Sequence, residues 1–359
     1  MTGRDLRPAG AVTAADPRRR RLLAKLGVFG AFGALGALGL FIAPGTTRAW
    51  AAAQAATGAG GAAGTAASAT TGATTARASV PHRIVTLNWE LTETLLALGV
   101  APIGTALPDW YRRTIVEPPL PPGVADIGLL YQPNFEVLLA LAPDLLIITP
   151  GHAPAKRWLE RLAPTITLGA YMSSDTPYPA LLGETTELAA RLQRPQQASE
   201  LISATGRITS QVRAQLAAHP SLTRAPVLVA DLVDDRHLRV YAQGSLFDEM
   251  LQKLGVHNAA NPGAGGNPWR TEGGFALVPV QRLAEVPQAS LLLVGPVPPA
   301  ALSGLEKNAI WQALPVVRER RIAALPVIAP YGGLVSMQRF AQAVAAALAA
   351  IDNGGGGVA

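Results

Sequence analysis

Apolar runs and helical repeats alternate along the first half of the folded chain. Short apolar segments predict strands at 83–87, 100–105, 144–149 and 165–168. Apolar residues spaced as on one face of a helix predict helices at 93–98, 134–141 and 158–162. Residues 145–148 are all apolar, as in a strand buried on both faces of a parallel sheet. The alternation predicts an N-terminal α/β lobe over 80–177.

Residues 178–220 break this rhythm because they carry no strand signal. Pro195 suits the first turn of a helix, and apolar residues then recur at helical spacing. One helix of about 35 Å is therefore expected over 195–218, within a helical connector at 178–220.

After the connector the alternation returns. Strands are expected at 226–230, 238–241, 291–294 and 321–325, and helices at 246–254 and 336–351. This pattern predicts a C-terminal α/β lobe over 221–351, followed by a flexible tail at 352–359. The predicted fold is α/β, with two Rossmann-like lobes, each with a central parallel sheet, joined by one long helix. A groove between two lobes is a common ligand position.

The N-terminus is typical of an export signal. Four arginines at 18–21 and two leucines precede a Gly- and Ala-rich apolar stretch at 26–43, and Ala49-Trp50-Ala51 offers a small-residue cleavage site. The arginine pair before two leucines resembles a twin-arginine signal, so 1–51 is predicted to be a cleavable signal for export to the periplasm. A retained membrane anchor is the alternative, since the apolar stretch is just long enough to span a bilayer. The Ala-, Gly- and Thr-rich segment 52–79 is predicted to be a disordered linker.

The net charge of +6 suggests nucleic acid until its position is considered. Residues 1–51 hold eight of the 30 basic and two of the 24 acidic residues, which accounts for the whole excess. No basic face is therefore expected on the folded lobes, and nucleic acid is not an expected partner. The chain has no cysteine, which excludes disulfides, thiolate metal sites and a lipid-modified cysteine.

Enzyme motifs are absent from the sequence. It holds no G-x-S-x-G elbow, phosphate-binding Walker loop, dinucleotide fingerprint or H-E-x-x-H pair, so no catalytic role is expected. The five histidines are scattered, whereas a zinc or manganese site needs several converging ligands.

Several segments within 82–347 together resemble the periplasmic siderophore- and cobalamin-binding proteins with a helical backbone, and most closely those that bind ferric hydroxamates. They are Arg83-Ile84-Val85-Thr86-Leu87-Asn88-Trp89, Glu117-Pro118-Pro119-Leu120-Pro121, Asp126-Ile127-Gly128-Leu129, Gln132-Pro133-Asn134-Phe135-Glu136, Gly244-Ser245-Leu246-Phe247, Asn267-Pro268-Trp269 and Trp311-Gln312-Ala313-Leu314-Pro315. The resemblance implies a monomeric binding protein that takes up a pre-formed iron(III)–siderophore complex without a cofactor. The implied partners are an inner-membrane ABC permease and its ATPase.

The resemblance also implies ligand-contacting residues. Trp269 is the first candidate, with Asn267 and Thr271 from the same loop, and Tyr331 matches a tyrosine of the family's ligand groove. The usual groove arginine is replaced by Leu130, followed by Tyr131, and the hydroxamate-bonding tyrosine is replaced by His152. Arg112, Arg113 and Arg270 are the candidates for the missing charge. Further candidates are Trp110, Tyr111 and Trp89.

Each of these residues has a structural alternative. For Trp269 it is a cap on the C-terminal core, and for Tyr331 and His152 it is an ordinary loop residue. The resemblance further implies that one carboxylate on each lobe docks on permease arginines. Glu136 matches the N-terminal position, whereas the C-terminal position is Gln281, with Glu285 one turn further on. Cobalamin, haem or another ferric chelate remains an alternative ligand, and a tethered structural protein an alternative class.

Overall fold

The structure is a computed structural model, and it describes residues 80–261 and 269–357. The predicted signal and linker and the candidate Asn267 lie outside these residues.

The N-terminal lobe is built on a five-stranded sheet in the order β3-β2-β1-β6-β7, with every pair parallel. Its strands are β1 (Ile84–Thr86), β2 (Gly104–Thr105), β3 (Ala125–Asp126), β6 (Leu145–Ile148) and β7 (Thr165–Thr167). Its helices are α2 (Trp89–Ala97), α3 (Pro108–Thr114), α4 (Phe135–Leu141) and α5 (Lys156–Leu159), with 3-10 turns η1 (Pro150–His152) and η2 (Ala170–Ser173). A small hairpin, β4 (Gly128–Leu129) and β5 (Gln132–Pro133), lies between β3 and α4.

Helix α2 begins earlier than the apolar periodicity predicts. The Asn88 side-chain oxygen accepts a hydrogen bond from the Leu91 N–H at 2.9 Å, which caps the helix at its first turn. Trp89 and Glu90 are therefore helical.

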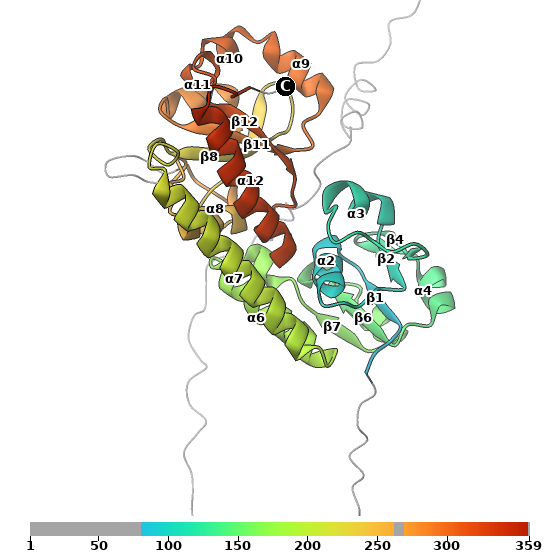
Figure 1. Ribbon diagram of the computed structural model, residues 1–359. Coiled ribbons are helices and arrows are strands. Elements are labelled where there is room, and N and C mark those ends of the chain that lie inside the picture. Colours follow the sequence, from blue (N-terminus) through green and yellow to red (C-terminus); the bar gives the residue numbers. More distant parts are fainter. Residues whose placement is uncertain (1–79, 262–268, 358–359) are drawn as a thin grey trace, which may run out of the picture. The chain divides into compact units, whose positions relative to one another are not determined.

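The connector consists of α6 (Pro177–Arg191) and α7 (Pro195–Ala218). Helix α7 covers the range that its sequence pattern gives, and α12 runs alongside it (Figure 1).

The C-terminal sheet has the order β10-β9-β8-β11-β12, with strands β8 (Val227–Leu232), β9 (His237–Tyr241), β10 (Phe275–Pro279), β11 (Ser290–Gly295) and β12 (Ile322–Val327). Strands β8, β11 and β12 are parallel, but β9 is antiparallel to both of its neighbours. The sheet is thus mixed rather than wholly parallel, because the connection at 233–236 is long enough for a hairpin and too short for a parallel crossover. The helical elements of this lobe are α8 (Leu246–Leu254), η3 (Val280–Glu285), α9 (Pro299–Glu306), α10 (Ala309–Ala313), α11 (Pro315–Arg318) and α12 (Leu334–Asp352).

One apolar core extends through both lobes. It contains Ile84 and Leu95 from the first lobe, Leu216 from α7, and Phe247 and Phe340 from the second lobe. The rings of Phe247 and Phe340 stack with centroids 4.2 Å apart. The lobes are therefore joined by shared packing as well as by the connector.

Helix α12 is, within the described part of the chain, the one helix long and apolar enough to cross a membrane. It packs against α7, α8 and β12 and contributes buried residues such as Met337 and Val344 to the core. This packing makes α12 a core helix of the C-terminal lobe. The tail predicted to be flexible also packs as far as Gly357, whose N–H donates to the Ile322 carbonyl at 2.7 Å.

Candidate functional site

The two lobes meet where α2 faces the loop between β12 and α12. The Glu93 carboxylate on α2 accepts hydrogen bonds from the Ser336 N–H and hydroxyl, both at 2.8 Å. It thereby caps the start of α12, whose N-cap residue is Gly333 and has no side chain. A Cβ on Gly333 would lie 2.9 Å from the Thr94 hydroxyl oxygen, so glycine is what permits this close approach.

Two more contacts hold the lobes together. The buried Tyr171 hydroxyl of η2 donates to the Tyr331 carbonyl at 2.8 Å. The Arg339 guanidinium on α12 donates to the Ile115 carbonyl at 3.1 Å and lies 3.7 Å from Glu117. The first of these contacts fixes the backbone of a predicted ligand residue.

Tyr331 lies between charged groups of both lobes. It is half-buried, and its hydroxyl donates to the Gly273 carbonyl at 3.3 Å. Burial raises the pKa of Tyr331 to about 12; Arg239 opposes that rise, and the carboxyl groups of Asp231 and Glu90 add to it. These contacts place Tyr331 between the two lobes, as expected of a tyrosine of the ligand groove.

An arginine that the sequence reasoning missed lies on this side of the C-terminal sheet. Arg239 on β9 is paired in register with Asp231 on β8, and Nη1 lies 3.2 Å from Oδ2. Its guanidinium also lies over the Phe275 ring, 5.3 Å from the centroid. The strand alternation at 238–241, with Leu238 and Val240 on the buried face, could have shown that Arg239 faces the other way.

The three arginines that the sequence suggested are all exposed. Arg112 is exposed and pairs with Asp109 at 2.9 Å. Arg113 is exposed with its guanidinium 5.9 Å from the Trp110 ring, and Arg270 is exposed.

Glu90 is the second residue that sequence reasoning missed. It is a carboxylic acid only 7% exposed, in the first turn of α2. Burial raises its pKa to about 7, against smaller lowering effects of its own N–H and the Asn88 side chain. Its charge in turn adds to the raised pKa of Tyr131 and of Tyr171, for both of which burial is the largest cause. We call Glu90, Tyr131, Tyr171, Asp231, Arg239 and Tyr331 the interlobe cluster.

His152 does not offer a free ring nitrogen to a ligand, contrary to the expectation. It is 2% exposed, and the Thr149 N–H and hydroxyl lie 3.2 and 2.9 Å from Nδ1. With Nδ1 accepting, Nε2–H donates to the Leu130 carbonyl at 2.6 Å. Burial lowers the pKa of His152, which keeps the ring neutral. Its role is to hold the β4–β5 hairpin.

That hairpin presents Tyr131. Its ring centroid is 5.1 Å from that of His152, and 47% of Tyr131 is exposed. The Leu130 side chain packs instead on the N-terminal core, so a ligand contact through that side chain is not supported.

The aromatic residues near α3 divide into two kinds. Tyr111 is fully buried, and its hydroxyl donates to the Pro118 carbonyl at 2.7 Å, so the ligand role predicted for it is wrong. Trp89 and Trp110 are half-buried and stack with centroids 6.1 Å apart. The Trp89 indole also donates to the Ala106 carbonyl at 2.7 Å. These two rings stay candidates for ligand contact.

Trp269 caps the C-terminal core, which was the alternative to its predicted ligand role. It is 5% exposed, its indole N–H donates to Glu285 at 3.0 Å, and the Arg282 guanidinium lies 4.7 Å from its ring centroid. Trp269 is thus enclosed by residues of its own lobe. Thr271, half-buried, donates its hydroxyl to the Gln243 carbonyl at 3.1 Å.

The two docking candidates differ in the same way. Glu136 is exposed in the first turn of α4, between the exposed side chains of Phe135 and Leu139. Glu285 is tied to Arg282 at 2.8 Å as well as to Trp269, and the Arg282 side chain lowers its pKa. The Glu285 carboxylate is therefore already bound within its own lobe, whereas the Glu136 carboxylate is available to bind another protein.

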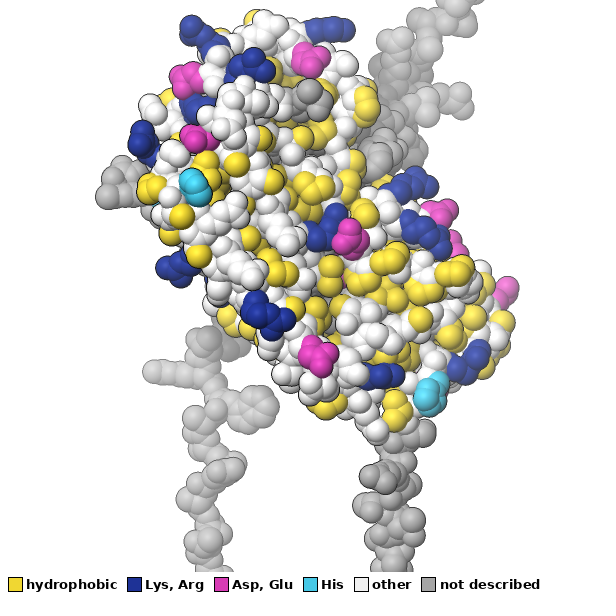
Figure 2. Space-filling model, viewed as in Figure 1, with side chains coloured by type: hydrophobic (Ala, Val, Ile, Leu, Met, Phe, Trp, Pro, Cys, Tyr) yellow, Lys and Arg dark blue, Asp and Glu magenta, His cyan; other side chains and the backbone are white. Residues whose placement is uncertain are grey.

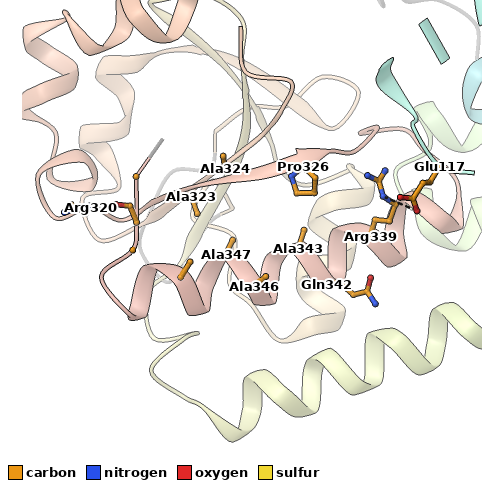
Figure 3. Close-up of a pocket in the computed structure, with 14 residues that line it drawn as sticks. Glu117, Arg320, Ala323, Ala324, Pro326, Arg339, Gln342, Ala343, Ala346 and Ala347 are labelled. Carbon is orange, nitrogen blue, oxygen red and sulfur yellow. Dashed lines mark hydrogen bonds and ion pairs between the residues drawn. The ribbon is translucent and has the colours of Figure 1, made fainter. Parts of the chain in front are cut away.

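A separate groove of about 780 Å³ runs along α12 and β12 (Figure 3). Small side chains such as Ala343 and Ala347 line most of it, and the Arg339–Glu117 pair lies at one end. The residues that line it include no aromatic side chain, whereas the interlobe cluster contains three tyrosines. Among the described residues, no group of three His, Asp or Glu side chains is arranged to hold a metal ion.

Basic and acidic side chains are interspersed over the face shown in Figure 2, with apolar side chains between them. This distribution agrees with the balanced charge of residues beyond 51.

The chain belongs to the periplasmic binding protein family, whose model matches residues 84–329. The iron(3+)-hydroxamate-binding protein FhuD of Escherichia coli is 32% identical over 289 residues, which cover 79% of this chain and 90% of that protein. The structure of the siderophore-binding protein FhuD from Vibrio cholerae with Fe3+–Desferal has a TM-score of 0.67 at 25% identity, covering 75% of this chain and 98% of that one. SirA of Staphylococcus aureus, complexed with staphyloferrin B, shares the fold with a TM-score of 0.57 at 17% identity, over 76% and 94% of the two chains. The matches confirm the expected fold, two α/β lobes on a helical backbone.

Proposed function

We propose that this chain captures a pre-formed ferric hydroxamate siderophore at the interlobe cluster and delivers it to an inner-membrane ABC permease with its ATPase. The observation that carries the proposal is the position of Tyr331. Its backbone is held to the first lobe by Tyr171, and its hydroxyl lies between Glu90 of the first lobe and Arg239 of the second. A hydroxamate chelate fills the coordination sphere of its iron. The protein then needs aromatic faces and hydrogen-bond donors rather than metal ligands. The iron(3+)-hydroxamate named for the Escherichia coli relative and the Fe3+–Desferal bound to the Vibrio cholerae one support the same class.

A fluorescence titration tests this function. The purified protein is titrated with ferrichrome and ferrioxamine B while its tryptophan fluorescence is followed. Saturable quenching at micromolar or lower concentration is expected. The Tyr331→Phe variant should bind about fivefold more weakly, since one hydrogen bond contributes about 1 kcal/mol. Binding of haem, cobalamin or another chelate without binding of any ferric hydroxamate would reject the substrate class.

Docking on the permease is assigned to Glu136. Its exposed carboxylate between the exposed Phe135 and Leu139 side chains suits pairing with an arginine of the permease. The Glu136→Arg variant should keep its affinity for the chelate but lose uptake of radiolabelled iron by cells. Glu160→Arg, another exposed position on the same lobe, is the matched control. Equal uptake by both variants would remove Glu136 from the docking surface.

Export through the twin-arginine route is also proposed, with residues 1–51 as the signal. The arginine pair before Leu22 and Leu23 supports it. Replacing Arg20 and Arg21 by lysine should leave the protein in the cytoplasm, as cell fractionation would show. Continued appearance in the periplasm would point to the general export route.

A further inference from the structure

Glu90 is a buried carboxylic acid that the shared fold does not explain. It lies in the first turn of α2, three residues before Glu93, so both side chains lie on one face of the helix. Glu93 accepts hydrogen bonds from Ser336 in the first turn of α12, directly after the loop that carries Tyr331. Glu90 lies toward the same loop, since its charge adds to the raised pKa of Tyr331. Among the described residues, no basic side chain lies within ion-pair distance of Glu90.

The one cation of the interlobe cluster is already neutralised. Arg239 pairs with Asp231 on the adjacent strand, so that pair adds no net charge to the interlobe cluster. When Glu90 is ionised, the cluster is therefore net negative. A buried carboxylate without a counter-ion is costly, and a cation that enters with the ligand relieves that cost.

We propose that Glu90 is the subsite for a cationic group of the ligand, so that this protein prefers ferric hydroxamates with a pendant ammonium over neutral or anionic chelates. This inference rests on the proposed function, because it concerns the ligand of the same site. A pendant ammonium would lie against Glu90, while the body of the chelate meets the tyrosines.

Because Glu90 titrates near neutral pH, the pH dependence of ligand affinity can test this subsite. Its pKa of about 7 means that acid and carboxylate coexist near neutral pH. A bound ammonium selects the carboxylate, so its affinity should rise about tenfold from pH 6 to pH 8.

The other groups that face Glu90 do not mimic this change. Burial raises the pKa values of the facing tyrosines Tyr131, Tyr171 and Tyr331, so they stay neutral throughout the range. Burial raises the pKa of Asp231 and the Arg239 charge opposes that rise, and both residues are retained in a Glu90 variant. Glu93, whose pKa is also raised to about 7 by burial, is retained in a Glu90 variant and reveals its own contribution there.

The experiment compares three probes at pH 6, 7 and 8 by fluorescence titration. They are ferrioxamine B, which carries an ammonium, its N-acetylated neutral form, and a trianionic ferric tricatecholate. We expect the wild type to favour ferrioxamine B over the acetylated form at least tenfold at pH 8. The preference should fall toward unity at pH 6. The Glu90→Gln variant should bind both hydroxamates alike at every pH, and the exposed Glu160→Gln control should behave as wild type.

The outcomes separate the two claims. If the wild type binds both hydroxamates equally with a flat pH profile, the cationic subsite is overturned and the proposed function stands. The same holds if Glu90→Gln keeps the preference and its pH dependence. If neither hydroxamate binds, both claims fall. Should the variant fail to fold, a wild type without the preference or without its pH dependence still overturns the cationic subsite.

Discussion

The cap that Glu93 places on α12 makes the stability of the protein depend on pH. Replacing Glu93 by Gln keeps an oxygen for the Ser336 N–H and an amide for the Ser336 hydroxyl, but removes the titration. Burial raises the pKa of Glu93 from 4.5 to about 7, with Ser336 and Gly333 as smaller lowering contributions and the Glu90 charge as a small raising one.

The sign follows from the direction of that shift. The folded state holds the proton more tightly than the unfolded state. The stabilisation by Glu93 is therefore full below the unfolded pKa and is lost as pH rises through 7. A difference of about 2.5 pKa units corresponds to about 3 kcal/mol, of which about 2.5 kcal/mol is lost between pH 5 and pH 8.

Urea unfolding followed by tryptophan fluorescence measures this effect. The free energy of unfolding of Glu93→Gln minus that of the wild type should rise by about 2.5 kcal/mol from pH 5 to pH 8. Groups that titrate in both proteins cancel in the difference. A difference independent of pH would show that Glu93 has an ordinary pKa in the folded protein and would refute the reasoning.

The remaining predictions concern residues whose roles the structure revises or defines. Trp269→Ala should lower stability by about 3–5 kcal/mol in urea unfolding, with unchanged affinity for ferric hydroxamates; a selective loss of affinity would return Trp269 to the ligand site. His152→Ala leaves the Leu130 carbonyl unpaired and should lower the free energy of unfolding by about 1–3 kcal/mol. The β4–β5 hairpin, no longer held by the His152 ring, should also bind the ligand less tightly. An unchanged free energy of unfolding would contradict the hydrogen bonds at both ring nitrogens. Gly333→Ala should lower the melting temperature because its Cβ meets the Thr94 hydroxyl, whereas Gly183→Ala, in open space on α6, should not.

The fold was largely predictable because its signals are local. Buried parallel strands read as apolar runs, and the connector helix reads as an uninterrupted helical repeat after Pro195. The antiparallel placement of β9 depends on the length of the turn before it, which a search for apolar runs does not weigh.

The candidate site was less predictable for a physical reason. Glu90 was missed because apolar periodicity placed the start of α2 at Glu93. Recognising Asn88 as an N-cap would have put both glutamates on one helical face. Trp269 was predicted to contact the ligand because its glycine-rich loop gives no sequence pattern that shows whether the indole ring is buried in the core or exposed. Only tertiary contacts with Glu285 and Arg282 decide that.

The apolar core that passes through both lobes limits how the protein can signal that it is loaded. Opening the lobes widely would expose side chains such as Leu95 and Phe340 to water, at about 25 cal/mol for each Å² uncovered. A wide swing between empty and loaded forms is therefore disfavoured. The permease must then distinguish the empty from the loaded form by small rearrangements at the protein surface or by contact with the chelate itself. The free energy needed to release the chelate must come from the permease and its ATPase.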